Sequence, residues 1–143
     1  PEPDPEPDPL PEPEPPPVGQ WIGEPFWSAI CAKKGDPVKL CVETTGHQES
    51  SLNFVIYEAD SQWYQFVTQG TTVIAEKQLD PLTGRHKTCM TWPAWWTSDG
   101  GGDPEFLLKV TISGFQPVYM PANDSSMLHV GRYQTHSGSY CNQ

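Results

Sequence analysis

The sequence predicts an all-β protein: a seven-strand antiparallel β-sandwich preceded by an extended N-terminal polyproline II arm. Short runs of alternating apolar and polar residues recur along the chain, and turn residues separate them at fairly regular intervals. No stretch has a sustained apolar period of about 3.6 residues, so very little helix is expected. The first residues combine proline with acidic side chains, a composition that has no core to bury.

Residues 1–17 form the expected arm. Ten of these 17 residues are proline, six are acidic, and Leu10 is the only other side chain. Proline fixes φ and has no backbone donor, so the segment favours the extended polyproline II conformation. Residues 18–25 are expected to be a hinge, and residues 26–143 the sandwich domain.

The strands are expected where β-branched, aromatic and aliphatic residues alternate with polar ones. Gly35 in the segment KKGDP suits a turn with positive φ, and the segments DPLTGR and DGGGDPE have similar turn chemistry. In chain order, the expected strands are Phe26–Ala32, Val38–Thr44, Leu52–Glu58, Tyr64–Ala75 with a break at Gln69–Gly70, Lys87–Trp92, Phe106–Ser113 and Leu128–Tyr133.

Alternation also assigns the faces of these strands, because successive side chains of a strand point to opposite sides. Packing two apolar faces against each other gives the sandwich. The residues expected in its core are Val38, Leu40, Val42, Leu52, Phe54, Ile56, Met90, Trp92, Phe106, Leu108, Val110, Ile112, Leu128 and Val130. The residues expected on the outer faces include Lys39, Cys41, Glu43, Leu107, Lys109 and Thr111.

The charge distribution argues against a nucleic-acid partner. The net charge is −10, and the arm supplies six of the negative charges. Lysine and arginine total only eight and are scattered, whereas phosphate binding needs clustered cations. No apolar run approaches the roughly 20 residues that a membrane-spanning helix requires, so no membrane span is expected.

The four cysteines are Cys31, Cys41, Cys89 and Cys141. None belongs to a C-x-x-C pair and the histidines are widely separated, so a zinc site has little support. An even number of cysteines in a small β-type chain favours two disulfides over buried free thiols. Disulfides form in oxidising compartments, so an extracellular or cell-surface location is expected.

Several segments carry a resemblance to a known group of domains. The stretch GEPFWSAICAKKGDPVKLCVETTG, followed by LNFVIYEAD and EFLLKVTISGF, resembles bacterial Ig-like modules that open with G-E-P-x-W-S and K-x-G-D-x-V-x-L-x-V-x-T-x-G. The likeness runs from Gly23 to Val130. It implies an Ig-like sandwich appended to exported spike or cell-surface proteins, where such modules act as adaptors and spacers and are not typically enzymes. The four cysteines and the arm depart from the pattern.

An Ig-like arrangement, combined with the face assignment, suggests a disulfide pairing. Cys41 and Cys89 fall on the outer face of strands that would be neighbours in an Ig-like sheet. The expected bridges are therefore Cys41–Cys89 and Cys31–Cys141, and the second ties the first strand to the C-terminus. Cys31–Cys41 is a competing pair, because these residues flank the KKGDP turn almost symmetrically.

The segment TWPAWW is the most unusual part of the domain. Alternation places Trp92 in the core, but Trp95 and Trp96 are adjacent and follow a proline, so both cannot face inward. One interpretation is that the rings complete the core or shield its ends. The other is a contact surface, either for a sugar ring or for a polyproline II segment, whose rings pack between aromatic side chains.

The chain carries such a polyproline segment itself, which leads to the main functional hypothesis. The arm of one copy docks on the tryptophan surface of the next copy and joins the copies head to tail into an extracellular filament or surface structure. The alternatives are a carbohydrate-binding module and a spacer of a larger exported protein. The expected contact residues are Pro1, Pro3, Pro5, Pro7, Pro9, Leu10, Pro11, Pro13, Trp95 and Trp96.

No catalytic site, cofactor or metal is expected. Asp99, Asp103 and Glu105 are weak candidates for a calcium site around flexible glycines, but the segment lacks the register of a calcium-binding loop. The four histidines lie in four different segments, and no serine or cysteine has the context of a nucleophile. The sequence therefore predicts a binding or structural protein that is not an enzyme.

Overall fold

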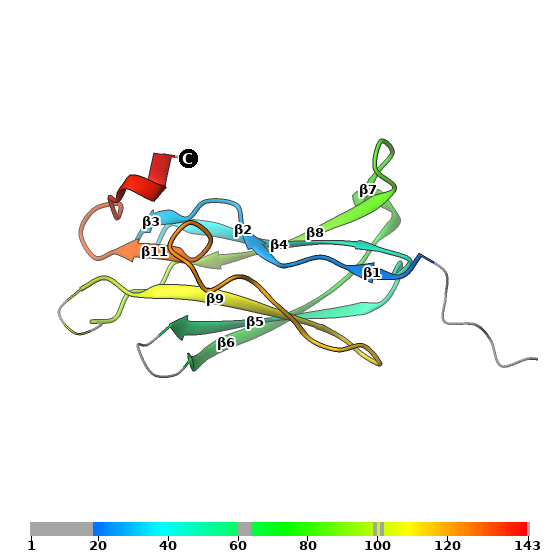
Figure 1. Ribbon diagram of the computed structural model, residues 1–143, viewed down its shortest axis with the longest axis horizontal. Coiled ribbons are helices and arrows are strands. Elements are labelled where there is room, and N and C mark those ends of the chain that lie inside the picture. Colours follow the sequence, from blue (N-terminus) through cyan, green and yellow to red (C-terminus); the bar gives the residue numbers. More distant parts are fainter. Residues whose placement is uncertain (1–18, 60–63, 99, 101, 143) are drawn as a thin grey trace, which may run out of the picture.

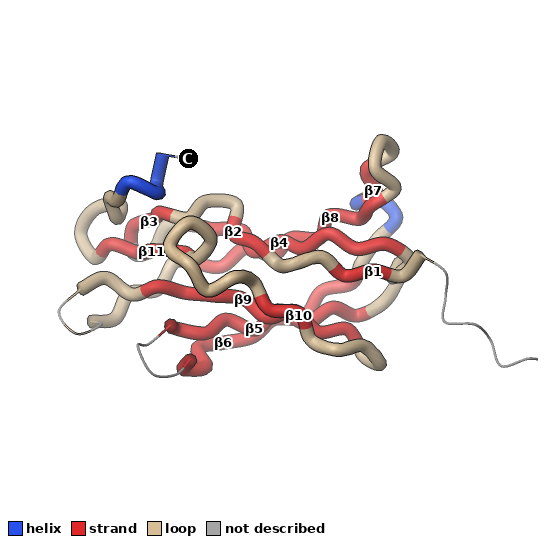
Figure 2. The backbone as a smooth tube through the Cα atoms, in the orientation of Figure 1, coloured by secondary structure: helices blue, strands red, loops and turns tan. Residues whose placement is uncertain are grey.

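The computed structural model describes residues 19–59, 64–98, 100 and 102–142. Two β-sheets pack face to face (Figures 1 and 2). The described residues form eleven strands and two short 3-10 helices, η1 (Glu76–Gln78) and η2 (Ser139–Asn142), with no α-helix among them. The all-β prediction is thus confirmed, while the arm, residues 1–17, lies outside the described residues.

The first sheet is antiparallel throughout its described pairs. Its strand order is β1-β4-β8-β7, and β2 pairs with β4 beside β1. The bounds are β1 (Trp21–Ile22), β2 (Phe26–Trp27), β4 (Pro37–Thr45), β7 (Leu79–Asp80) and β8 (Arg85–Pro93). Because β1 lies within the expected hinge, this sheet already begins at Trp21.

The second sheet has the order β3-β11-β9-β5-β6, with β10 paired to β9. All of its pairs are antiparallel except β3 and β11, which run parallel, contrary to the expected antiparallel arrangement. The bounds are β3 (Cys31–Lys33), β5 (Ser51–Ala59), β6 (Tyr64–Val73), β9 (Glu105–Ile112), β10 (Val118–Tyr119) and β11 (Leu128–Gly131).

The expected first strand, Phe26–Ala32, is divided between the two sheets. The backbone N–H of Ser28 still bonds to the carbonyl of Lys39 on β4, but the carbonyl of Ile30 already accepts a bond from the N–H of His129 on β11. The chain therefore crosses from one sheet to the other between these residues. This crossing produces β2 and β3 and accounts for the parallel pair.

The strand β6 continues through Gln69–Gly70, so the expected break is wrong. The irregularity lies elsewhere, where the register with β5 shifts between Ile56 and Tyr57. Gly70 has a packing role instead: a Cβ built there would lie 2.6 Å from Cε of Met90 on the facing sheet. A side chain at position 70 would displace that methionine.

The core follows the predicted apolar stripes with two kinds of exception. Met90 and Trp92 are only half-buried, although both pack against the core. Cys41, expected on an outer face, is buried in its disulfide with Cys89, and Leu107, also expected outside, is buried as well. Leu107 lies on the outer face of β9 directly opposite Tyr57 of β5, and Tyr57 also packs against the core cluster. The outer face of a central strand is thus covered by its neighbours, which alternation alone does not reveal.

Aromatic rings join the two sheets at one end of the core. The buried Trp27 of β2 donates a hydrogen bond from Nε1 to the backbone carbonyl of Phe106 on β9, at 3.0 Å. The ring of Trp92 lies 5.9 Å from that of Trp27 and 5.3 Å from that of Phe106, between centroids. Trp95 approaches Phe106 at 6.1 Å. This cluster holds the ends of β8 and β9 together.

Two disulfides are present, Cys41–Cys89 and Cys31–Cys141, the same pairs that the sequence analysis favoured. Cys41–Cys89 joins neighbouring strands β4 and β8, with a Cα–Cα distance of 4.1 Å. Cys31–Cys141 closes a sequence separation of 110 residues and attaches the C-terminal segment to β3. A disulfide typically contributes roughly 2–4 kcal/mol to stability.

Replacing Trp27 should separate the sheets where they are joined. Trp27→Phe removes the hydrogen bond to Phe106 and leaves a gap beside Trp92, so the free energy of unfolding should fall by about 2–4 kcal/mol. Urea denaturation measures this difference. The matched control is Trp21→Phe, because Trp21 is 42% exposed and its replacement should change stability little. Equal losses in the two variants would contradict the role assigned to Trp27.

The buried His47 predicts a pH effect on stability. It follows β4, its ring meets Phe115 edge-on at 4.6 Å, and neither ring nitrogen has a hydrogen-bond partner among the described residues. Burial lowers the pKa of His47. The unfolded chain therefore binds this proton first, and the contribution to stability falls as the pH drops below about 6.5.

His47→Leu should remove this dependence and raise the melting temperature, because an unpaired buried imidazole is replaced by an apolar side chain. Thermal denaturation of parent and variant between about pH 5 and about pH 8 gives the difference in slope. A parallel pH dependence in the two proteins would show that His47 already titrates normally in the folded state.

Candidate partner-binding site

The candidate site lies at the end of the sandwich where β8 and β11 terminate and β9 begins (Figure 1). Trp95 and Trp96 follow β8, Arg132 and Tyr133 follow β11, and Asp103 precedes β9. We call the first four residues, Trp95, Trp96, Arg132 and Tyr133, the tryptophan end. Antiparallel pairing brings the start of β9 beside β11, and packing of Trp92 and Trp95 on Phe106 brings the end of β8 from the facing sheet.

A cation lies between two aromatic rings at the tryptophan end. The guanidinium carbon of Arg132 is 4.9 Å from the ring centroid of Trp96 and 4.9 Å from that of Tyr133. Tyr133 is 81% exposed and Trp95 is 44% exposed. Within the described part of the chain, Arg132 is in neither of the two ion pairs. The surface therefore offers exposed rings and a positive charge.

The structure places the two candidate tryptophans together, but it does not expose them equally. Trp95 leans on Phe106 with one side and meets solvent with the other. Trp96 is half-buried, packs against the core, and donates a hydrogen bond from Nε1 to Oδ1 of Asp103 at 3.1 Å. Trp95 is thus the more accessible ring, whereas Trp96 is held in place by its polar partner.

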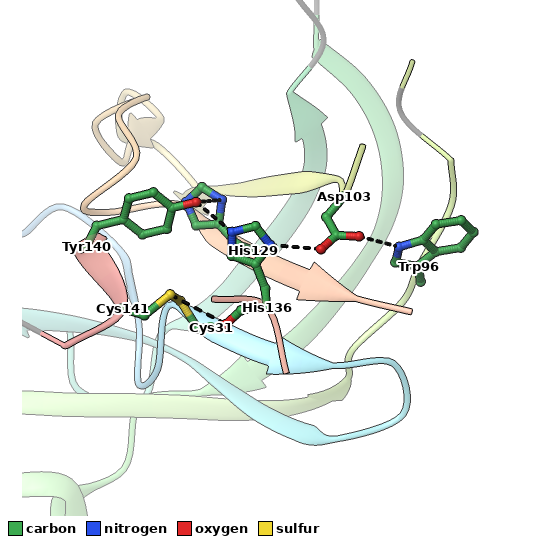
Figure 3. A network of polar contacts seen from close by, with 7 residues as sticks. All are labelled: Cys31, Trp96, Asp103, His129, His136, Tyr140 and Cys141. Carbon is green, nitrogen blue, oxygen red and sulfur yellow. Dashed lines mark hydrogen bonds and ion pairs between the residues drawn. A yellow bond between two sulfur atoms is a disulfide. The ribbon is translucent and has the colours of Figure 1, made fainter. Parts of the chain in front are cut away.

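Behind Asp103, a chain of polar contacts extends along the C-terminal segment (Figure 3). Oδ2 of Asp103 lies 2.8 Å from Nδ1 of His136, and Nε2 of His136 lies 2.6 Å from the hydroxyl of Tyr140. That hydroxyl is 3.3 Å from Nδ1 of His129, whose Nε2 lies 2.9 Å from the backbone carbonyl of Asp124. The three rings also stack on one another. We call this set, Asp103, His136, Tyr140, His129 and the Asp124 carbonyl, the polar chain.

The environment sets the charge states in the polar chain. Burial acts to raise the pKa of the Asp103 carboxyl, but hydrogen bonds from His136 and Trp96 outweigh it, so the pKa is lowered and Asp103 is ionised. Burial lowers the pKa of His129, with a smaller opposing effect from the Asp124 carbonyl. Burial also raises the pKa of Tyr140, which keeps its hydroxyl protonated.

Three local features hold the C-terminal segment against the sandwich. The Cys31–Cys141 disulfide anchors its far end, and the N–H of His136 bonds to the carbonyl of Ala32 on β3. Its near end turns sharply after Gly131, where a Cβ would lie only 1.9 Å from the carbonyl oxygen of Gln134. Only glycine fits at this position without moving the backbone.

This turn encloses a pocket. Asp103 and residues 131–137 line a volume of about 480 Å³. Arg132 supplies donors there, whereas the Asp103 carboxylate is engaged by Trp96 and His136, and both ring nitrogens of His136 already have partners. The pocket can therefore bind a small anionic or polar group, because its available charged side chain is cationic.

The weak metal candidates Asp99, Asp103 and Glu105 stay untested as a group. Asp99 lies outside the described residues, and Asp103 is bound to Trp96 and His136. Glu105, Asp124 and His129 offer ligand atoms within 4.8 Å of one another. Both ring nitrogens of His129 already have partners, however, so these residues are accounted for by hydrogen bonding.

Comparison of the chain with known proteins found no relative. No family model matches the chain, and no match occurs among curated proteins or solved structures. The resemblance to bacterial Ig-like modules stays a prediction. In the part of the chain that the structure describes, no helix is long and apolar enough to cross a membrane.

The sequence analysis identified Trp95 and Trp96 but missed the residues around them. Arg132 and Tyr133 were assigned to the end of the last expected strand, which in fact ends at Gly131. His136 and Tyr140 lie in a segment without alternation, and His136 is 33 residues from its partner Asp103. The only local signal was the composition of the C-terminal segment, in which histidine and tyrosine precede a cysteine.

Gly131→Ala should disrupt the site without unfolding the sandwich. The new methyl group would collide with Gln134, so residues 132–142 should lose protection from hydrogen exchange while β5 and β9 keep theirs. Mass spectrometry of peptides after exchange measures both regions. The control is Thr135→Ala in the same loop, where the side chain is exposed and protection should not change. Unchanged protection in Gly131→Ala would contradict the tight turn.

Proposed function

We propose that this chain is a structural subunit that assembles head to tail outside the cell, with the arm of one copy bound to the tryptophan end of the next. The observation that carries the proposal is the position of the first described residue, Gly19, which the arm precedes in sequence. Gly19 lies at the end of the sandwich opposite to the exposed rings. This position follows from the register of a single strand, β4.

The length of β4 gives the separation between the two ends of the sandwich. Its first residue, Pro37, pairs with Pro93, which precedes the tryptophans, and its last residue, Thr45, pairs with Trp21. Its nine residues extend about 30 Å. The first described residue of the domain therefore lies beside the far end of β4. A contact between opposite ends of two copies is heterologous and generates an open filament unless it closes a ring.

The chemistry of the arm matches that of the tryptophan end. Proline rings pack on exposed aromatic rings, and the polyproline II conformation leaves little entropy to lose on binding. The six carboxylates of the arm meet a surface where Arg132 lies close to Lys33 and Lys34, since both lysines contact Gly131 through the backbone. At about 3.1 Å per residue, the arm would extend roughly 50 Å, which exceeds the separation of the ends.

The proposal includes an Ig-like topology for the sandwich. The orders β2-β4-β8-β7 and β11-β9-β5-β6 correspond to the ABED and GFCC′ sheets of an Ig-like sandwich. This correspondence supports an Ig-like module. The two disulfides support an exported location, because they persist in oxidising compartments.

One observation favours a second candidate function, carbohydrate binding. On the outer face of the second sheet, Phe66 and Tyr119 are 59% and 51% exposed. Between them, Nζ of Lys109 lies 5.6 Å from the Tyr57 ring and 5.7 Å from the Tyr119 ring. Sugar rings stack on such exposed aromatic faces. This stripe is separate from the tryptophan end.

Removal of the arm tests the assembly directly. The intact chain should form filaments or large oligomers, and a chain lacking residues 1–17 should be monomeric, because the connector is gone. Light scattering and electron microscopy measure the difference. Monomers in both samples would exclude self-assembly and leave the module as a spacer or a glycan binder.

Two aromatic variants separate the candidate functions. Trp95→Ala should weaken assembly at least about tenfold, since a buried aromatic contact typically contributes more than 1.4 kcal/mol. Phe66→Ala, of a similarly exposed ring on the other surface, should assemble normally. A glycan array reports the alternative: binding lost in Phe66→Ala but kept in Trp95→Ala would favour the carbohydrate module.

A further inference from the structure

We propose that the pocket formed by Asp103 and residues 131–137 binds a carboxylate of the arm, and that one proton held in the polar chain controls this binding. The identity of the ligand rests on the proposed function. The proton follows from hydrogen-bond geometry alone.

The four contacts of the polar chain need one more hydrogen than its neutral groups supply. The Asp103 carboxylate and the Asp124 carbonyl stand at the two ends, and both can only accept. The four contacts between them need four hydrogens. The neutral His136, Tyr140 and His129 provide three, one each. The intact chain of contacts therefore carries one additional proton.

Two arrangements satisfy all four contacts. In one, His136 is doubly protonated and the Tyr140 hydroxyl donates to His129. In the other, His129 is doubly protonated and the hydroxyl donates to His136. The first is favoured because His129 is buried, whereas His136 lies 2.8 Å from the Asp103 carboxylate. The two rings bind this proton as one coupled unit.

The proton changes the charge of the pocket. When it is bound, the positive His136 and Arg132 outweigh the negative Asp103, and the pocket attracts an anion. When it is lost, Arg132 and Asp103 cancel, and one contact of the polar chain must break. The longest contact, at 3.3 Å between Tyr140 and His129, is expected to open first.

The neighbouring carboxylates favour the bound proton, although their negative charge opposes an anion. The carboxylates of Glu105 and Asp124 lie near Tyr140 and His129, and both favour retention of the proton. Arg132 is the cation at the pocket and is held between Trp96 and Tyr133. Its planar guanidinium can bind a carboxylate through two parallel hydrogen bonds.

The arm offers the matching ligand. Acidic residues occupy every second position from Glu2 to Asp8, with prolines between them. A carboxylate in the pocket would place neighbouring proline rings near the exposed Tyr133 and Trp95. The pocket thus selects an acidic proline-rich segment over a neutral one.

The shared proton is tested by exchange of the imidazole C2 hydrogen in the full chain, read by mass spectrometry at a series of pH values in the presence of a chelator. His136 should titrate once, and His129 should stay neutral over the same range. Tyr140→Phe removes an acceptor from the charged His136, so the midpoint should fall by about one pH unit. The control Tyr64→Phe, at an exposed position, should leave it unchanged. Independent titration of the His136 and His129 rings, or an unchanged midpoint in Tyr140→Phe, would contradict the proposal of a shared proton.

The ligand is tested with a labelled synthetic peptide of residues 1–17 and a second peptide in which every Glu and Asp is replaced by its amide. The acidic peptide should bind the full chain about tenfold more tightly near pH 5.5 than near pH 7.5, and Arg132→Gln should weaken binding at both pH values. Equal binding of the acidic peptide at both pH values, or equal binding of the acidic and amide peptides, would contradict the proposal that the pocket binds a carboxylate. Filament formation is scored separately, so peptide binding without filaments would count against assembly and not against the pocket.

Discussion

The hydrogen bond from the Trp27 indole to the carbonyl of Phe106 joins the two sheets at the end that carries the candidate site. Around it, Trp92 and Trp95 pack on the Phe106 ring, so the end of β8 and the start of β9 keep a fixed relation. Asp103 precedes β9 by two residues and meets Trp96 only because of this relation. A loss of contact between the sheets here would move the ring surface and the pocket together.

The C-terminal segment extends this fixed region beyond the sandwich. The sheets position Asp103 and His129, but the other half of the polar chain, His136 and Tyr140, comes from residues without regular sheet pairing. The Cys31–Cys141 bridge and the turn at Gly131 hold that segment in place. A covalent link suits this task, since a short terminal segment has little apolar surface of its own with which to stay ordered.

In the proposed assembly, the arm and the tryptophan end complement each other in three physical respects. A preorganised polyproline segment loses little entropy, exposed rings provide packing, and opposite charges select the partner. The six carboxylates of the arm also repel one another, and in the proposed assembly a cationic surface would compensate them. The proposed assembly and its proposed control would therefore use the same few residues.

The sequence by itself determined the all-β class, most strand positions and the buried stripes, because side-chain alternation is a local property of each strand. It also pointed to both cysteine pairs and to the adjacent tryptophans. Only the tertiary structure decided that Phe26–Ala32 divides between sheets, that β3 runs parallel to β11, and that Leu107 is covered. It alone brought His136 to Asp103, 33 residues away. These features depend on which strands become neighbours, and the two-residue periodicity of a strand carries no information about its neighbours.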